Sequence, residues 1–161
     1  MDAKKVFMYG LFGLFGAVIL SVLSAIGGAF GAGTALLVNS IIGNVLIASV
    51  VGGVVAALAF HAVIKGADKL FIKAAEKKAE QGNTGIKPPS LSSGKRYLWG
   101  SASYFVTTMI GVNLCHALLA NPAWFIVVTI LGTGLLGVLG LGAVVSLKLW
   151  DPSFKKQNDP S

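Results

Sequence analysis

Three side chains of types able to act as nucleophile, base or metal ligand lie in apolar segments: His61, Cys115 and His116. Adjacent residues of a helix point about 100° apart, so Cys115 and His116 make a poor nucleophile–base pair. His61 lies near one end of its segment and His116 near the opposite end of another. In the topology developed below they lie at opposite membrane faces, roughly 20 Å apart along the normal. They are weak candidates for cofactor ligands and cannot share a metal ion or haem iron, so we expect no metal, no cofactor and no catalytic residue.

The charge pattern of the chain excludes a soluble protein. Only 12% of the 161 residues are charged, against about a quarter in soluble domains. None lies between Val6 and Ile64, a run of 59 residues (6 through 64) that cannot form a water-exposed surface. The single cysteine excludes a disulfide scaffold. The net charge of +7 comes from residues that flank the apolar segments, so we expect no nucleic-acid partner.

Length and hydropathy predict an all-α integral membrane protein with four transmembrane helices arranged as two hairpins. A helix needs about 20 mostly apolar residues to cross a bilayer. Segments that qualify lie at about residues 6–30, 41–64, 97–120 and 123–147, within a single membrane domain covering 1–161. The glycine-rich run Gly27–Thr34 is the best break between the first two, and Asn121-Pro122 separates the last two. Three short spans within residues 6–64 are disfavoured, because Lys4 and Lys5 would then face away from the other basic residues.

The positions of the basic residues predict the orientation. With four spans, all 13 lysine and arginine residues fall on one side: at the N-terminus, between spans two and three, and in the tail at 148–161. The positive-inside rule places both termini and the 65–96 loop in the cytoplasm. We expect a bacterial or archaeal cytoplasmic membrane, with an organellar inner membrane as the alternative.

The 65–96 loop is predicted to begin with a basic helix over 65–81, which either continues span two or lies on the membrane surface, followed by a linker. Its lysines recur every four residues and form a strip against anionic headgroups or, as the favoured interpretation, a solvated face that sets topology. The candidate membrane-surface residues of this loop are Lys65, Lys69, Lys73, Lys77, Lys78, Lys95 and Arg96.

Small residues recur at three- and four-residue spacing in three of the four spans. Such faces let helix backbones approach closely, which is a main source of association in lipid. We therefore predict packing faces, used within the bundle or against another protein. They comprise Gly10, Gly13, Ala17, Ser24 and Gly27 in span one; Ser49, Gly52, Gly53, Ala56 and Ala57 in span two; and Gly134, Gly137 and Gly140 in span four.

Span three differs by its polar content, which includes Ser101, Thr107, Thr108 and Asn113. These side chains line a water-filled path or, more commonly, bond to neighbouring helices. The run Gly28–Ala35 resembles the small-residue runs of rotary-ATPase proteolipids, but no carboxylate lies within any span, which excludes that function. Two small-residue-rich helices around a basic loop resemble conjugative pilins in plan.

These observations predict a small, non-catalytic structural or accessory subunit of a larger membrane assembly. Its expected partners are membrane lipids, other membrane subunits or copies of itself, and bound lipids are expected. The alternative is a pore-forming component of holin-like, secretion-channel or pilin-like character, lined by the polar side of span three.

Overall fold

The computed structural model describes residues 3–80, 95–119 and 122–147, and within them the protein is all-helical, without strands. The elements are α1 (Ala3–Ala25), the π-helix η1 (Ile26–Ala32), α2 (Gly33–Ile42), α3 (Val45–Glu80), α4 (Lys95–Leu118) and α5 (Pro122–Ser146). Most of the predicted linker and the tail at 148–161 lie outside the described residues.

Three helical stretches in the described part of the chain are long and apolar enough to cross a membrane: Gly13–Ile42, Val45–Ala74 and Trp124–Ser146. They indicate a membrane-embedded protein. The fourth predicted span corresponds to α4, whose hydroxyl and amide side chains lower its hydropathy, so the four-span arrangement is not confirmed.

The first predicted break lies in a different place in the structure. The run Gly27–Thr34 is helical throughout, so α1, η1 and α2 follow one another without a loop from Ala3 to Ile42. Glycine lowers helix propensity, but close packing of this segment overrides that cost, as tertiary contacts often do. The chain turns instead at Gly43, the described glycine with positive φ (68°), which ends α2.

The turn at Gly43 is held by backbone and side-chain hydrogen bonds. The Gly43 N–H donates to the Asn39 carbonyl at 2.8 Å, closing the end of α2. The Asn44 side-chain oxygen accepts from the backbone N–H groups of Leu46 and Ile47, both at 3.1 Å, and so caps the start of α3. These bonds fix a tight α2–α3 hairpin.

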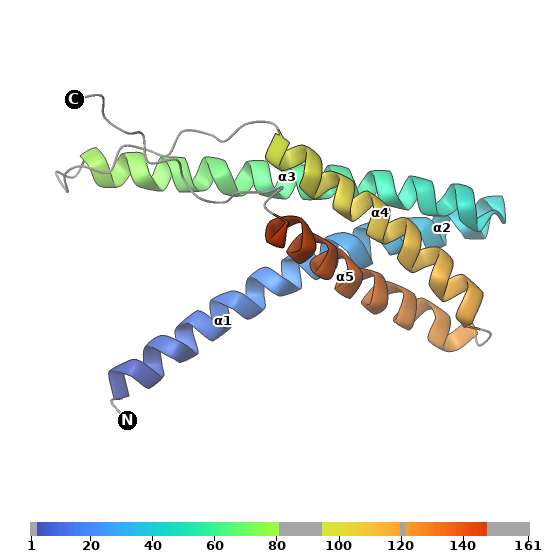
Figure 1. Cartoon of the computed structure of the whole chain (residues 1–161), viewed down its shortest axis with the longest axis horizontal. Coiled ribbons are helices and arrows are strands. Elements are labelled where there is room, and N and C mark those ends of the chain that lie inside the picture. The colour runs from blue at the N-terminus through green and yellow to red at the C-terminus, as the bar shows by residue number, and fades with distance from the viewer. Residues whose placement is uncertain (1–2, 81–94, 120–121, 148–161) are drawn as a thin grey trace.

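The helices pack around η1, with two segments extending beyond the others. Figure 1 shows the N-terminal half of α1 diverging from the other helices, and α3 running on as a straight helix past the start of α4. The basic segment after Ile64 is thus a continuation of the second apolar helix, and of the two conformations predicted for it the structure has the first. Pro122 begins α5, where a missing N–H costs nothing.

Candidate functional site

The centre of the bundle is η1, which α3, α4 and α5 surround. Ile26, Gly27, Gly28, Gly31 and Ala32 are buried there. At the end of η1 the Gly33 N–H is shared between the Gly28 and Phe30 carbonyls. The segment that sequence analysis treated as a break is therefore the best-packed part of the first helix.

The contact between η1 and α5 brings backbone against backbone. A Cβ on Gly28 would lie 2.4 Å from the Ile130 carbonyl oxygen, and one on Gly27 would lie 3.1 Å from that of Thr133. Across the same interface, a Cβ on Gly134 would lie 2.6 Å from the Ser24 hydroxyl. Real Cβ atoms do not approach other atoms at 2.4 or 2.6 Å, so these crossings require glycine.

The contacts of η1 with α3 and α4 also depend on glycine. A Cβ on Gly52 would lie 2.4 Å from the Gly31 carbonyl oxygen, and one on Gly31 would lie 2.9 Å from the Thr108 hydroxyl and 3.0 Å from Ala56. Each neighbour fills the space that the glycine leaves. The first helix is thus packed closely against α3, α4 and α5 along η1.

Aromatic rings fill the half of the bundle nearer the start of α4. Phe60 stacks on Tyr104 with ring centroids 4.8 Å apart, and both side chains are fully buried. Glycines leave the space that these rings occupy. A Cβ on Gly100 would lie 2.3 Å from the Phe60 ring, and one on Gly137 would lie 2.8 Å from the Tyr104 ring. The Tyr104 hydroxyl donates to the Leu23 carbonyl at 2.9 Å, which ties α4 to α1.

Polar side chains lie inside the bundle in the other half, near the start of α3 and the end of α4. The Asn113 amide donates to the Ser49 hydroxyl and to the Met109 carbonyl, both at 2.8 Å. The Ser49 hydroxyl in turn donates to the Leu46 carbonyl at 2.9 Å. The hydroxyl oxygens of Ser101, Thr108, Thr129 and Thr133 are buried and have no hydrogen-bond partner among the described residues.

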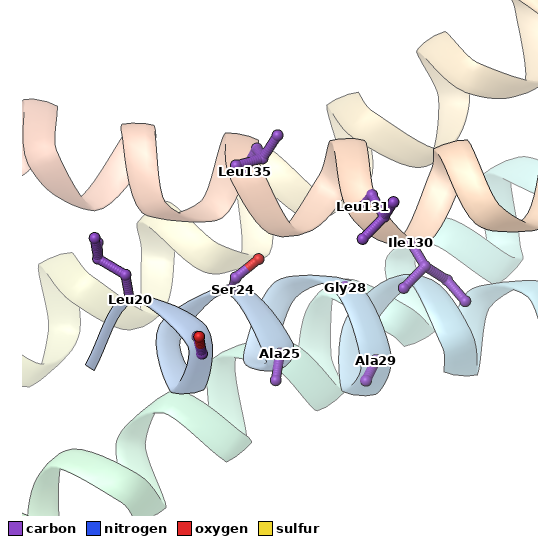
Figure 2. A pocket seen from close by; sticks show the side chains of 9 residues that line it. Leu20, Ser24, Ala25, Gly28, Ala29, Ile130, Leu131 and Leu135 are labelled. Carbon is purple, nitrogen blue, oxygen red and sulfur yellow. The ribbon is translucent and has the colours of Figure 1, made fainter. Parts of the chain in front are cut away.

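An open groove runs between α1–η1 and α5. It is lined by three leucines and Ile130 and by small residues of α1 and η1. Figure 2 shows Ser24 pointing from α1 toward α5, whereas Ala25 and Ala29 point away from α5. α1 therefore presents one small-residue side to α5 and a second to the surroundings.

The predicted packing residues divide between these two sides and the bundle interior. Gly13 and Ala17 are exposed on α1, and a Cβ on Gly13 would meet nothing within 4 Å. Gly10 also lies in α1, in a stretch whose side-chain surroundings are not described. The interior holds Gly27, Ser49, Gly52, Gly53, Ala56, Gly134 and Gly137, with Ser24, Ala57 and Gly140 half-buried at its edge.

The two histidines contact aromatic rings. The ring centroids of His61 and Tyr97 are 5.4 Å apart, and those of His116 and Phe125 are 5.9 Å apart. They sit near opposite ends of the bundle. No group of three or more histidine, cysteine or acidic side chains that could hold a metal ion occurs within residues 3–80, 95–119 and 122–147.

The basic residues of the loop lie on the extension of α3 and at the start of α4. Lys65, Lys69, Lys73 and Lys77 are exposed, in a row along α3. Lys78 belongs to α3, and Lys95 and Arg96 begin α4, but their side chains lie outside the description. On the same extension, the Asp68 carboxylate accepts a 2.5 Å hydrogen bond from the Tyr97 hydroxyl, which joins it to the first turn of α4.

Sequence reasoning overlooked four interior glycines that lie against the Ile130 carbonyl, Thr108, Phe60 and Thr133, namely Gly28, Gly31, Gly100 and Gly111 respectively. The four-residue spacing of Gly27 and Gly31 would have indicated a helical face, had the run not been taken as a break. Comparison with known proteins adds nothing further, since no family model, curated protein or solved structure matches the chain.

Replacing Gly28 or Gly52 by alanine tests the backbone crossings. Each added Cβ collides with a carbonyl oxygen that a side-chain rotation cannot move, so we expect each variant to lower the free energy of unfolding by about 1–3 kcal/mol or more. Unfolding in mixed detergent micelles measures the loss. The matched control is Gly16→Ala, which meets nothing within 4 Å and should be neutral or slightly stabilising. Equal stability of all three variants would contradict the packing described.

Proposed function

We propose that this chain is a four-span, non-catalytic structural subunit of a membrane assembly, and that it associates through the outward side of α1. Membrane lipids and other membrane subunits are its partners in this proposal. Its membrane is a bacterial or archaeal cytoplasmic membrane.

The surface of α4 supports its role as the fourth span. Its buried side carries the hydroxyl and amide groups, while its exposed side carries a row of apolar residues spaced four apart, Val106, Ile110, Leu114 and Leu118. Leu118 is 72% exposed. In water this arrangement would be inverted, so hydrocarbon is the medium that suits it.

The ends of the helices support a cytoplasmic location for both termini. The α2–α3 turn is uncharged, as is the sequence between α4 and α5. The basic residues lie toward the opposite ends of these helices or in the sequence beyond them: at the start of α1, on the extension of α3 and after it, at the start of α4, and after α5. Such an asymmetry in short loops sets orientation during insertion.

Single-cysteine labelling in intact cells, in a Cys115→Ser background, tests whether α3 crosses the membrane in the proposed orientation. We expect Ser40→Cys, exposed near the α2–α3 turn, to react with a membrane-impermeant maleimide from outside. Lys69→Cys, on the extension of α3, should react only after the cells are opened. Labelling of both from the same side would contradict an α3 that crosses the membrane.

The observation that carries the assembly proposal is the free outer side of α1. Gly13, Ala17, Ser21 and Ala25 recur every four residues and are all exposed. Most other small-residue faces of the chain are filled by its own helices, whereas this row begins in the half of α1 that diverges from them (Figure 1) and ends at Ala25, which points away from α5 (Figure 2). Small residues at four-residue spacing are typical of helix–helix interfaces in lipid.

Native size after mild detergent extraction tests this association. We expect the wild-type chain to run in a complex larger than its 16.6 kDa mass, and Ala17→Leu to release it, because the larger side chain separates the helix backbones. Val18→Leu, on an adjacent exposed side of α1, is the matched control and should leave the complex intact. A wild-type chain that is stable as an isolated monomer, with no partner, would refute the proposal.

The alternative function is a pore, which is favoured by buried hydroxyls of α4 and α5 that have no partner among the described residues. Thr108, Thr129 and Thr133 would line a polar path if the helices moved apart. In that case liposomes containing only this protein should release a small trapped dye, and Thr133→Val should slow the release. Vesicles that stay tight would exclude the pore.

A further inference from the structure

The groove between α1–η1 and α5 lies far from any charged residue of the helices that form it. Its lining comes from residues 20–29 and 130–135, within two of the helical stretches that are able to cross a membrane. The nearest charges along these helices are Lys5, 15 residues before the groove, and Lys148, 13 residues after it. At 1.5 Å per residue each is about 20 Å away, which is more than half the thickness of the hydrocarbon core. The groove therefore faces hydrocarbon, and an occupant at this depth must be apolar.

Two backbone contacts hold the helices together beside the groove. Gly28 lies against the Ile130 carbonyl, and a Cβ on Gly134 would lie 2.6 Å from the Ser24 hydroxyl. Figure 2 shows Ser24 pointing from α1 toward α5. Because the helices touch at both positions, the groove is a channel beside a close crossing and not a gap between two separated helices.

Leucine side chains line the groove but remain largely exposed. Leu131 and Leu135 of α5 are 60% and 62% exposed, and Leu20 of α1 is 53% exposed. Small residues of α1 and η1 line the rest, beside Ile130. The leucines can therefore contact a further apolar group in the groove.

The size of the groove fits a hydrocarbon chain better than a helix. Its volume is about 500 Å³, and residues 20–29 extend over about 13 Å at 1.5 Å per residue. The mean cross-section is therefore about 40 Å², whereas a helix with its side chains is about 10–12 Å across and has a cross-section of about 80–110 Å². A lipid acyl chain is a single file of methylene groups and is much narrower. It can lie within the groove, whereas a helix can only cover it.

We propose that this groove binds an acyl chain of a membrane lipid, with the end of the chain near the middle of the bilayer. Leu131 and Leu135 contact the chain from α5, and Leu20 contacts it from α1. Attraction between apolar groups in lipid comes from contact at short range, and a groove provides that contact on more than one side. The lipid headgroup lies about 15 Å away, at the edge of the hydrocarbon core, so the site selects chains and not headgroups.

Retention of lipid after mild detergent extraction tests the site. We expect native mass spectrometry to show one bound lipid per chain after reconstitution in dioleoylphosphatidylcholine vesicles and extraction. Leu131→Trp places a larger side chain in the groove and should abolish this retention. Leu139→Trp is the matched control, because Leu139 is also exposed on α5, at 68%, but does not line the groove. A wild-type chain without bound lipid, or equal retention by the two variants, would overturn the proposal.

Lipids that differ in chain length or headgroup separate a chain site from a headgroup site. Dilauroylphosphatidylcholine has shorter chains that end near the groove, so we expect it to be retained less than the dioleoyl lipid. Dioleoylphosphatidylglycerol keeps the long chains and changes only the headgroup, so it should be retained as well as the choline lipid. Retention that follows the headgroup and ignores chain length would contradict an acyl-chain site.

The site depends only on the membrane location of the chain and not on the proposed assembly, although Ser21 and Ala25 belong both to the groove and to the outward side of α1. Ala17→Leu separates the two proposals, because Ala17 lies on that outward side three residues before the groove begins. After extraction from the native membrane, this variant should lose its partners and keep its lipid. Loss of the lipid together with the partners would show that a partner helix covers the groove, against the proposal.

Discussion

The structure depends on close approach of helix backbones at η1. Lipid tails are as apolar as leucine, so helices in a bilayer gain little by burying leucine against leucine, and their attraction comes from contact at short range. Gly28 against the Ile130 carbonyl and Gly52 against the Gly31 carbonyl provide that contact on two sides of one helix. Because both crossings share η1, the positions of α3, α4 and α5 relative to one another are set through a seven-residue segment.

Polarity in this bundle is distributed in the reverse of a soluble protein. The interior holds glycine, hydroxyl and amide groups, such as Ser49 and Asn113, whereas leucines and valines cover the outside. The arrangement explains why α4 has low mean hydropathy although its outer side is apolar. A hydropathy window averages over both sides of a helix and therefore undervalues one whose polar side faces its neighbours.

The sequence was enough to predict an all-helical, membrane-embedded chain, because length and the absence of charge depend on composition alone. It did not locate the first turn. Glycine propensity favoured a break at Gly27–Thr34, but the same lack of side chains that weakens an isolated helix permits the contacts that stabilise this one. Gly43, a single glycine with positive φ, makes the turn instead. The contact of Thr133 with α4 could not be predicted either. Which side of α4 faces Thr133 depends on the crossing of α4 and α5 and not on either helix alone.

The absence of a loop between α1 and α2 has a consequence for the surrounding bilayer. Charge-free helix runs from Val6 to Ile42, 37 residues (6 through 42) and about 55 Å at 1.5 Å per residue, against a hydrocarbon thickness of about 30 Å. A tilt of 40°, the upper end of the usual range, still leaves about 42 Å. The excess is accommodated by bending at η1, by local thickening of the lipid around α1, or by helix ends that lie in the headgroup region. A charge-free helix of this length therefore exceeds a bilayer of average thickness, and each ångström of such a mismatch costs a fraction of a kcal/mol.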